Sequence, residues 1–299
     1  MEATIGNADA LIKTGGQSVT CSLLNGVGMW QSDNVTAPSP VPGDAFCTSR
    51  PRLRWEIAIV LAITLGQSAL YSVLALIRRV LSPTPLGQQQ TQLNPSRDAA
   101  AAWDALYQLL DIVFDLALVA LVVYLLWEPG VNALRRIGLD FTRFGSDVGL
   151  GVVVTAVIGI PGLALYAVGR MLGFSVAVVA SPLDAAWWTV PILLFAAVRA
   201  ALLEEVIMLG WLFDRLRRLG WGWWPIILSS AALRGAYHAY QGFGGMLGNF
   251  VMGIVFGWCY RRWGRVMPLV VAHTILDIVS FLGYPLAAAL WPTVFAPVA

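Results

Sequence analysis

The sequence predicts an all-α polytopic membrane protein, a bundle of seven or eight transmembrane helices. Of its 299 residues, 58% are hydrophobic and only 12% are charged, whereas soluble domains carry about 25% charged residues. Residues 57–77 and 148–169 contain no charged side chain, and residues 235–260 contain a single histidine. Each run reaches the length of about 20 apolar residues that a spanning helix needs. Lipid offers the backbone no hydrogen-bond partners, and unbroken apolar runs exclude a barrel, so the spans must be helices.

Composition divides the chain into four regions. Residues 1–50 are rich in Gly, Ser, Thr, Asn and Pro, and we expect them to form a disordered polar tail. Residues 51–183 are expected to form the N-terminal transmembrane helices, and residues 184–283 a core of further helices. Residues 284–299 are apolar but contain prolines, so they form a short eighth span or an interfacial helix. The seven expected spans are residues 55–79, 105–127, 147–171, 184–213, 223–240, 245–262 and 266–283.

The arginines outside the spans predict the orientation. With a cytoplasmic N-terminus, the cytoplasmic side receives the arginine clusters within residues 50–54, 135–143, 215–218 and 261–265. Positive charge accumulates in cytoplasmic loops, so this bias predicts a multi-pass protein of the cell membrane with its N-terminus in the cytoplasm. The opposite side receives only Arg78, Arg79, Arg97 and Arg170.

Ionisable side chains inside the expected spans are the candidate functional residues. A charge at the centre of a bilayer costs at least about 2.5–3.5 kcal/mol, so such residues are functional candidates by default. The acids outnumber the arginines among them, so the surplus negative charge must be met by protons, water or a metal cation. The set comprises Asp111, Asp115, Arg199, Glu204, Glu205, Arg234, His238, His273 and Asp277.

Helical spacing groups these residues. His273 and Asp277 are separated by four residues and share a helix face, as do Arg234 and His238. A lone histidine in a span often only bonds another helix, but two histidines with carboxylates on nearby helices favour chemistry. The expected depths of Glu204 and His238 in the membrane do not match. Glu204 falls near the cytoplasmic end of its span and His238 nearer the opposite side, so helix tilt must close a mismatch of about 10–15 Å.

Adjacent glutamates pose a second geometric question. Glu204 and Glu205 differ by about 100° around a helix, so we expect that they cannot both point into one site along the same direction. One would act while a neighbouring group holds the other.

The acids of the second expected span form a separate stripe. Asp104, Asp111 and Asp115 recur at helical spacing along one face. They line a wet cavity or pair with Arg199, and Asp115 is a candidate modulator of the site. On the sixth expected span, Gly253 and the glycine four residues later predict close helix packing.

Three short motifs in order resemble those of the CAAX protease and bacteriocin-processing family of intramembrane proteases. That family shows Glu-Glu-xxx-Arg, Phe-xxx-His and His-xxx-Asn/Asp motifs on successive helices. The resemblance covers about residues 184–283. The matching residues are Glu204 and Glu205, then His238, then His273 and Asp277.

The sequence departs from the family pattern at two positions. Leu209 stands where the family usually has arginine, and Arg234 stands where it usually has phenylalanine. Because Arg234 shares a face with His238, we hypothesise that it supplies, from the neighbouring helix, the cation that normally partners a glutamate. The alternative is a site that has drifted into a weak or silent state.

The resemblance implies hydrolysis of a peptide bond in a hydrophobic or lipidated, CAAX-like substrate, within or beside the membrane. Glu204, helped by His238, is expected to activate water as a general base. Glu205 would orient the site, and His273 with Asp277 would hold the oxyanion or a metal. An ionised Asp277 only accepts hydrogen bonds, so it would bind a metal or orient His273.

A metal ion is the expected cofactor, although the sequence leaves open whether it is required. Glutamate and histidine are ligand types that zinc accepts, and the tentative ligands are Glu204, His238 and His273. Two other function classes remain open: a proton-coupled transporter, because buried acids and histidines also form proton relays, and a non-catalytic membrane scaffold. The expected partners are the lipid bilayer and a hydrophobic peptide or protein substrate, with no nucleic acid.

Overall fold

Two compact units, Met1–Ile59 and Val60–Ala299, make up the chain. The computed structural model describes residues 12–14, 17–19, 49–180 and 186–295. In the first unit, strand β1 (Ile12–Thr14) pairs antiparallel with β2 (Gln17–Val19), and helix α1 (Arg50–Ile63) begins. The predicted disorder of residues 1–50 falls mostly outside the described residues, so it stays a prediction.

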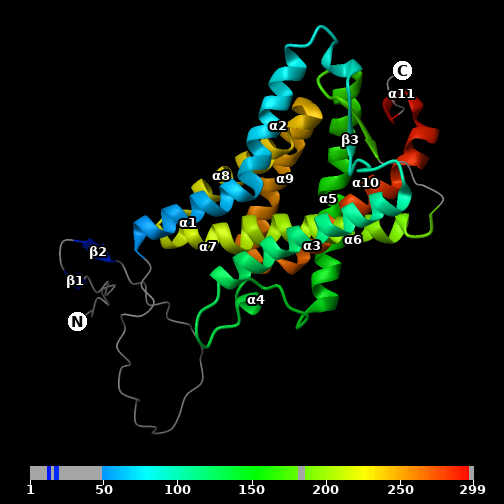
Figure 1. Ribbon diagram of the computed structural model, residues 1–299. Helices are drawn as coiled ribbons and strands as arrows, with labels where there is room; N and C mark the ends of the chain where they lie inside the picture. The colour runs from blue at the N-terminus through cyan, green and yellow to red at the C-terminus, as the bar shows by residue number, and fades with distance from the viewer. Residues whose placement is uncertain (1–11, 15–16, 20–48, 181–185, 296–299) are drawn as a thin grey trace, which may run out of the picture. The chain divides into compact units, whose positions relative to one another are not determined.

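Helices dominate the second unit, as the sequence predicts. Its elements are α2 (Leu65–Val80), the 3-10 turn η1 (Leu86–Gln88), β3 (Gln90–Leu93), α3 (Ala101–Leu125), α4 (Ala133–Arg136), α5 (Phe144–Met171), β4 (Ala177–Ala180), α6 (Thr189–Glu205), the π-helical segment η2 (Val206–Leu212), α7 (Phe213–Arg218), α8 (Trp223–Tyr237), the 3-10 turn η3 (Ala239–Gln241), α9 (Gly242–Trp263), α10 (Met267–Leu290) and α11 (Pro292–Phe295) (Figure 1). Strands β3 and β4 pair in parallel.

Four of the described helices are long and apolar enough to cross a membrane: α3, α5, α10 and the stretch from η3 through α9. A fifth candidate is the pair α1 and α2, which bends by 53° where the two helices meet. The chain is therefore a multi-pass membrane protein. Seven or eight spans stay a prediction, since α6 and α8, with 17 and 15 residues, are shorter than these candidates. The described part of residues 284–299 contains no further long helix, because α10 continues to Leu290 and α11 has only four residues.

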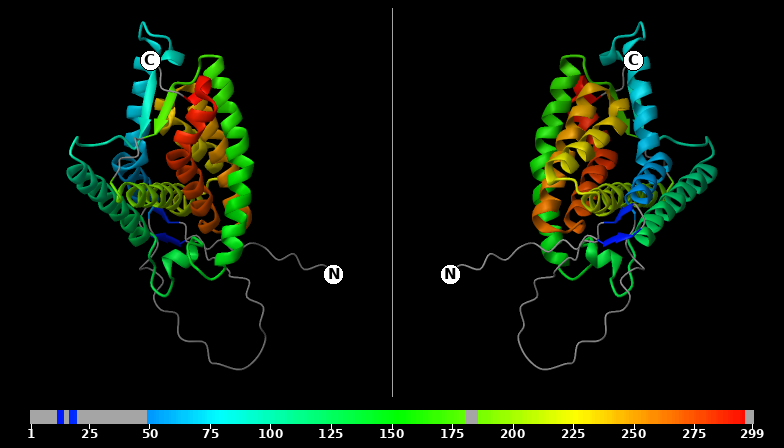
Figure 2. Two further views of the ribbon diagram at one scale, coloured as in Figure 1. Left: turned by 90° about the vertical axis from the view of Figure 1, so that its right-hand side faces the viewer. Right: turned by 90° about the vertical axis from the view of Figure 1, so that its left-hand side faces the viewer.

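The expected span 184–213 differs most from a regular transmembrane helix. Its α-helical part ends at Glu205, and η2 continues it with wider i→i+5 hydrogen bonding and seven buried residues. Figures 1 and 2 show that α6 lies across the direction of α5 rather than alongside it. It packs between α3 and α10. Because α6 lies across the direction of α5, the residues at its C-terminal end enter the interior of the helix bundle laterally rather than from one end of the bundle.

Helices α8 and α9 approach closely, as the glycine pattern predicts. A Cβ atom on Gly253 would lie 2.7 Å from the Cα atom of Ala231 and 3.4 Å from Cδ of Arg234. A Cβ atom on Gly257 would lie 3.2 Å from Ile227. The absence of these side chains lets the two backbones pack together, and it leaves room for the arginine of α8.

The start of α10 is held by a cluster around Arg265. Its Nη2 atom lies 2.6 Å from Oδ2 of Asp147, which is buried in the first turn of α5, and 3.1 Å from Oδ1 of Asp140. Gly138 makes this approach possible, because its φ angle is +68° and a Cβ atom there would lie 2.5 Å from the Cα atom of Arg265. This cluster sets the position of α10, and with it that of His273.

Candidate active site

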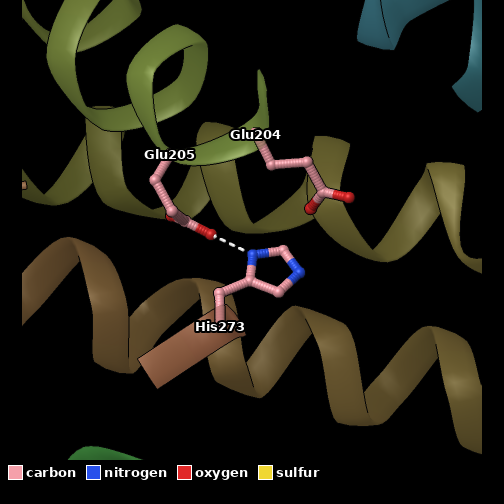
Figure 3. A group of neighbouring side chains, drawn as sticks. All are labelled: Glu204, Glu205 and His273. Carbon is pink, nitrogen blue, oxygen red and sulfur yellow. Dashed lines mark hydrogen bonds and ion pairs between the residues drawn. The ribbon is translucent and has the colours of Figure 1, made fainter. Parts of the chain in front are cut away.

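The junction of α6 and η2 carries the two adjacent glutamates at the centre of the site. The side chain of Glu205 is completely buried, and that of Glu204 is 13% exposed. Figure 3 shows both side chains extending from α6 towards His273 of α10. One carboxylate is thus closed off from solvent, while the other remains accessible.

Arg234 of α8 lies between the glutamates. Its Nη1 atom donates a hydrogen bond to Oε2 of Glu204 at 3.2 Å, and its Nη2 atom donates to Oε1 of Glu205 at 2.7 Å. The guanidinium carbon lies 5.3 Å from the ring centroid of Phe256, on α9. Arg234 thus stands as a buried cation between two carboxylates. Its part in a reaction stays a prediction.

Although Glu204 and Glu205 leave the helix in different directions, as expected, their carboxylates reach one site. Ligand atoms of Glu204, Glu205 and His273 all lie within 4.8 Å of one another. Each glutamate has three side-chain torsions, so two carboxylates that leave the backbone about 100° apart can converge. The forked guanidinium of Arg234 then binds one oxygen of each with a different nitrogen.

Helix α10 brings His273 and Asp277 to the same place. The Nδ1 atom of His273 lies 2.7 Å from Oε1 of Glu205, and its Nε2 atom lies 3.7 Å from Oδ2 of Asp277. The first contact is a hydrogen bond, whereas the second is too long for one. Glu205 therefore orients the imidazole through one ring nitrogen. Among the described residues, the other nitrogen has no direct partner at hydrogen-bond distance.

His238 follows directly on α8, and its ring is held by the backbone. Its Nδ1 atom lies 3.1 Å from the carbonyl oxygen of Arg234. A carbonyl only accepts, so Nδ1 carries a proton, and in the neutral ring Nε2 is an acceptor. The predicted mismatch between Glu204 and His238 stays a prediction, but the neighbour of His238, Tyr237, reaches Glu204 at 2.6 Å.

The contact between Tyr237 and Glu204 is the feature of the site that the sequence did not predict. A signal was present, since Tyr237 directly precedes a motif histidine and lies three residues after Arg234. Spacing alone does not identify its partner on another helix. Only the crossing of α6 and α8 does so.

Among the described residues, the metal-capable group consists of Glu204, Glu205 and His273. The tentative ligand set from the sequence contained His238, which is not part of this group. Two carboxylates and an imidazole are donors that zinc accepts. The Oε2 atom of Glu205 is buried and has no hydrogen-bond partner among the described residues, so this oxygen could coordinate a bound cation. The donor set therefore fits a zinc ion.

Asp115 lies outside this group but is connected to α6. Its Oδ2 atom lies 2.6 Å from Nη1 of Arg199, which is the pairing that the sequence allowed. Asp111 instead pairs with Arg97 at 2.5 Å, and this pair is more exposed. Two acids of the stripe on α3, Asp111 and Asp115, therefore form ion pairs with arginines.

Comparison with known families agrees with this geometry. Residues 186–279 match the family described as type II CAAX prenyl endopeptidase Rce1-like. Searches of curated proteins and of solved structures found no significant match. The matched range contains the two glutamates, both histidines and Asp277, in the order of the family motifs. Residues 186–279 are therefore an Rce1-like domain of the CAAX protease and bacteriocin-processing family.

Proposed function

We propose that the protein is an intramembrane endopeptidase that cleaves a hydrophobic or lipidated, CAAX-like substrate by means of activated water. Membership of the family implies a protease, prenylated protein substrates and a membrane setting. The observation that carries the proposal is the convergence of Glu204, Glu205 and His273 within 4.8 Å in the interior of the family domain. A cavity that admits substrate and water together is part of the proposal.

Glu204 is the proposed general base. It is the more accessible of the two glutamates, and a carboxylate can take a proton from water as the water attacks a carbonyl. His238 assists, because its unprotonated Nε2 atom can accept a hydrogen bond from the same water. Such proton transfer contributes about 10²–10⁴-fold to a rate.

His273 is proposed to stabilise the oxyanion. Its Nδ1 atom is held by Glu205, so Nε2 is free to donate to the developing negative charge when the ring is protonated. One donor of this kind is worth about 2.7–4 kcal/mol. Asp277, which is 3.7 Å from Nε2, would form an ion pair with the protonated ring rather than touch the oxyanion.

Zinc is the proposed cofactor, held by Glu204, Glu205 and His273; with zinc bound, His273 would be a ligand and would not donate to the oxyanion. When bound, it would supply a Lewis acid for the water and for the peptide carbonyl. The hydrogen bond from His273 to Glu205 resembles the carboxylate–histidine arrangement that orients metal ligands.

Cleavage of a prenylated peptide by the purified protein tests the proposal. We expect Glu204→Gln to lower kcat at least about a hundredfold, because glutamine cannot accept the proton. The matched control is Asp111→Asn, which neutralises an acid of α3 that pairs with Arg97 away from the site. Equal cleavage by wild type and Glu204→Gln would contradict the catalytic assignment.

A second candidate, a non-catalytic membrane scaffold, is favoured by one observation. Arg234 is almost completely buried and pairs with both glutamates, so its single positive charge offsets one of their two negative charges. In a scaffold this pairing would serve packing alone. The same experiment separates the candidates, since a scaffold cleaves no peptide and responds to Glu204→Gln only through stability.

The finer topology is also part of the proposal. We propose a cytoplasmic N-terminus, seven or eight spans and a location in the cell membrane, supported by the arginine bias of the loops. Labelling of single cysteines introduced into each loop, from either side of sealed vesicles, tests the orientation and the count together.

A further inference from the structure

We infer that Tyr237 is a positioning residue that holds Glu204 by one carboxylate oxygen and leaves the other free for water. The inference rests on the proposed peptidase function and extends it to a residue outside the family motifs. Its basis is a hydrogen bond of 2.6 Å from the Tyr237 hydroxyl to Oε2 of Glu204.

The two oxygens of Glu204 are in different situations. Oε2 accepts from Tyr237 at 2.6 Å and from Nη1 of Arg234 at 3.2 Å. In the described part of the chain, no group donates a hydrogen bond to Oε1. The side chain keeps 13% of its exposure, while that of Glu205 keeps none. The carboxylate is thus anchored at one oxygen and can receive a water molecule at the other.

Tyr237 is itself fixed at both ends. Its backbone carbonyl accepts a hydrogen bond from Oγ of Ser72 on α2 at 2.8 Å. Carbonyls in the last turn of a helix lack partners within the helix, so this bond ties the end of α8 to α2. The tyrosine is 5% exposed, and its ring centroid lies 4.7 Å from that of His238. The hydroxyl therefore approaches Glu204 from a rigid support.

A free glutamate could adopt several rotamers, of which few place an oxygen beside the scissile carbonyl. A general base must lie within hydrogen-bond reach of the proton that it takes. A hydrogen bond to a charged group contributes about 1.5–3 kcal/mol, which corresponds to about ten- to a hundredfold in an equilibrium. Removing only the phenolic oxygen should therefore cost about this factor in the fraction of correctly placed Glu204.

The test compares Tyr237→Phe with Tyr240→Phe. Tyr240 lies three residues further on, and its hydroxyl accepts from Gln241 at 3.0 Å, so the control loses the same atom from the same region. For Tyr237→Phe we expect kcat to fall at least about tenfold with KM within twofold of wild type. The control should stay within twofold in both. A Tyr237→Phe enzyme with unchanged kcat, or with a raised KM alone, would overturn the inference.

A stability cycle gives a readout that does not depend on activity. Apparent Tm in detergent is measured for Tyr237→Phe, Glu204→Ala and the double variant. We expect Tyr237→Phe to lower Tm in the wild-type background and to have little effect once Glu204 is gone. Additive shifts would overturn the inference. Absence of cleavage by the wild type would contradict the proposed function instead, and the cycle would then decide the Tyr237 contact by itself.

Discussion

Nη2 of Arg234 lies 2.7 Å from Oε1 of Glu205, and the two side chains are only 2% and 0% exposed. This pair joins α8 to the end of α6 inside the family domain. The family usually has arginine at the position of Leu209 and phenylalanine at that of Arg234. In this chain the buried cation is thus supplied by a different helix.

Moving the arginine back tests whether its charge or its position matters. Arg234→Phe leaves the buried carboxylate of Glu205 and the partly exposed one of Glu204 without their cation, and breaking a buried pair costs about 3–5 kcal/mol. We expect a lower Tm and no cleavage. The double variant Arg234→Phe/Leu209→Arg restores the family pattern, and we expect it to regain part of both. Normal Tm and cleavage in Arg234→Phe alone would show that the pair is dispensable.

Zinc binding is predicted to distinguish the roles of the two histidines, His238 and His273. We expect a chelator to abolish cleavage and added zinc to restore it. His273→Ala should lower zinc affinity at least about tenfold, because His273 belongs to the metal-capable group. His238→Ala should lower kcat but retain zinc, as measured by metal content after gel filtration. Loss of zinc in His238→Ala with retention in His273→Ala would reverse the assignment.

The pair of Asp115 and Arg199 is predicted to support α6 from α3. Their side chains are 28% and 21% exposed, so Asp115→Ala leaves a largely buried guanidinium unpaired. We expect a loss of about 1–3 kcal/mol in the free energy of unfolding. The exchange Asp115→Arg/Arg199→Asp should recover part of it. The comparison is Asp111→Ala, whose pair is more exposed and should matter less. Equal losses of unfolding free energy in the two alanine variants would show that Asp115 supports the fold no more than Asp111 does.

Close packing of α8 and α9 is predicted to position Arg234. In Gly253→Ala the new methyl group would lie 2.7 Å from the Cα atom of Ala231, which is backbone and cannot move aside. We expect a loss of about 1–3 kcal/mol from overpacking, together with a lower kcat. Gly248→Ala on the same helix is the control, because its methyl group would make only an ordinary contact of 3.5 Å with Leu165. Tm and kcat of the two variants give the comparison.

Acid should weaken the support at the start of α10. Hydrogen bonds from Thr142 and then Arg265 hold the pKa of Asp140 below its usual range. The unfolded chain therefore takes up a proton at a higher pH, near the usual aspartate value of about 3.9, than the folded chain does. The stabilisation is present above that pH and is lost as pH falls below it. We expect Tm of Asp140→Asn to depend less steeply on pH below about 5 than that of wild type, with Thr142→Val in between. Parallel curves would refute this.

Much of the fold follows from local properties of the chain. The long apolar runs of residues 57–77 and 148–169 have no alternative to helix in lipid, and helices lie there in the structure. The motif residues could also be identified, because each lies at a fixed spacing within one helix. The number of spans depends on more than local properties, because α6 and α8 are apolar yet short, and hydrophobicity does not distinguish a short buried helix from a span.

The sequence by itself determined the helical membrane fold and the chemical inventory of the site: two glutamates, two histidines and an aspartate in family order. Only the tertiary structure decided which of them meet. Because α6 lies across the bundle, Glu204 and Glu205 converge on Arg234, and Tyr237 reaches Glu204. These contacts join residues 29 to 33 positions apart on different helices. Periodicity describes the face of one helix but not the angle at which two helices cross, so packing alone determines them.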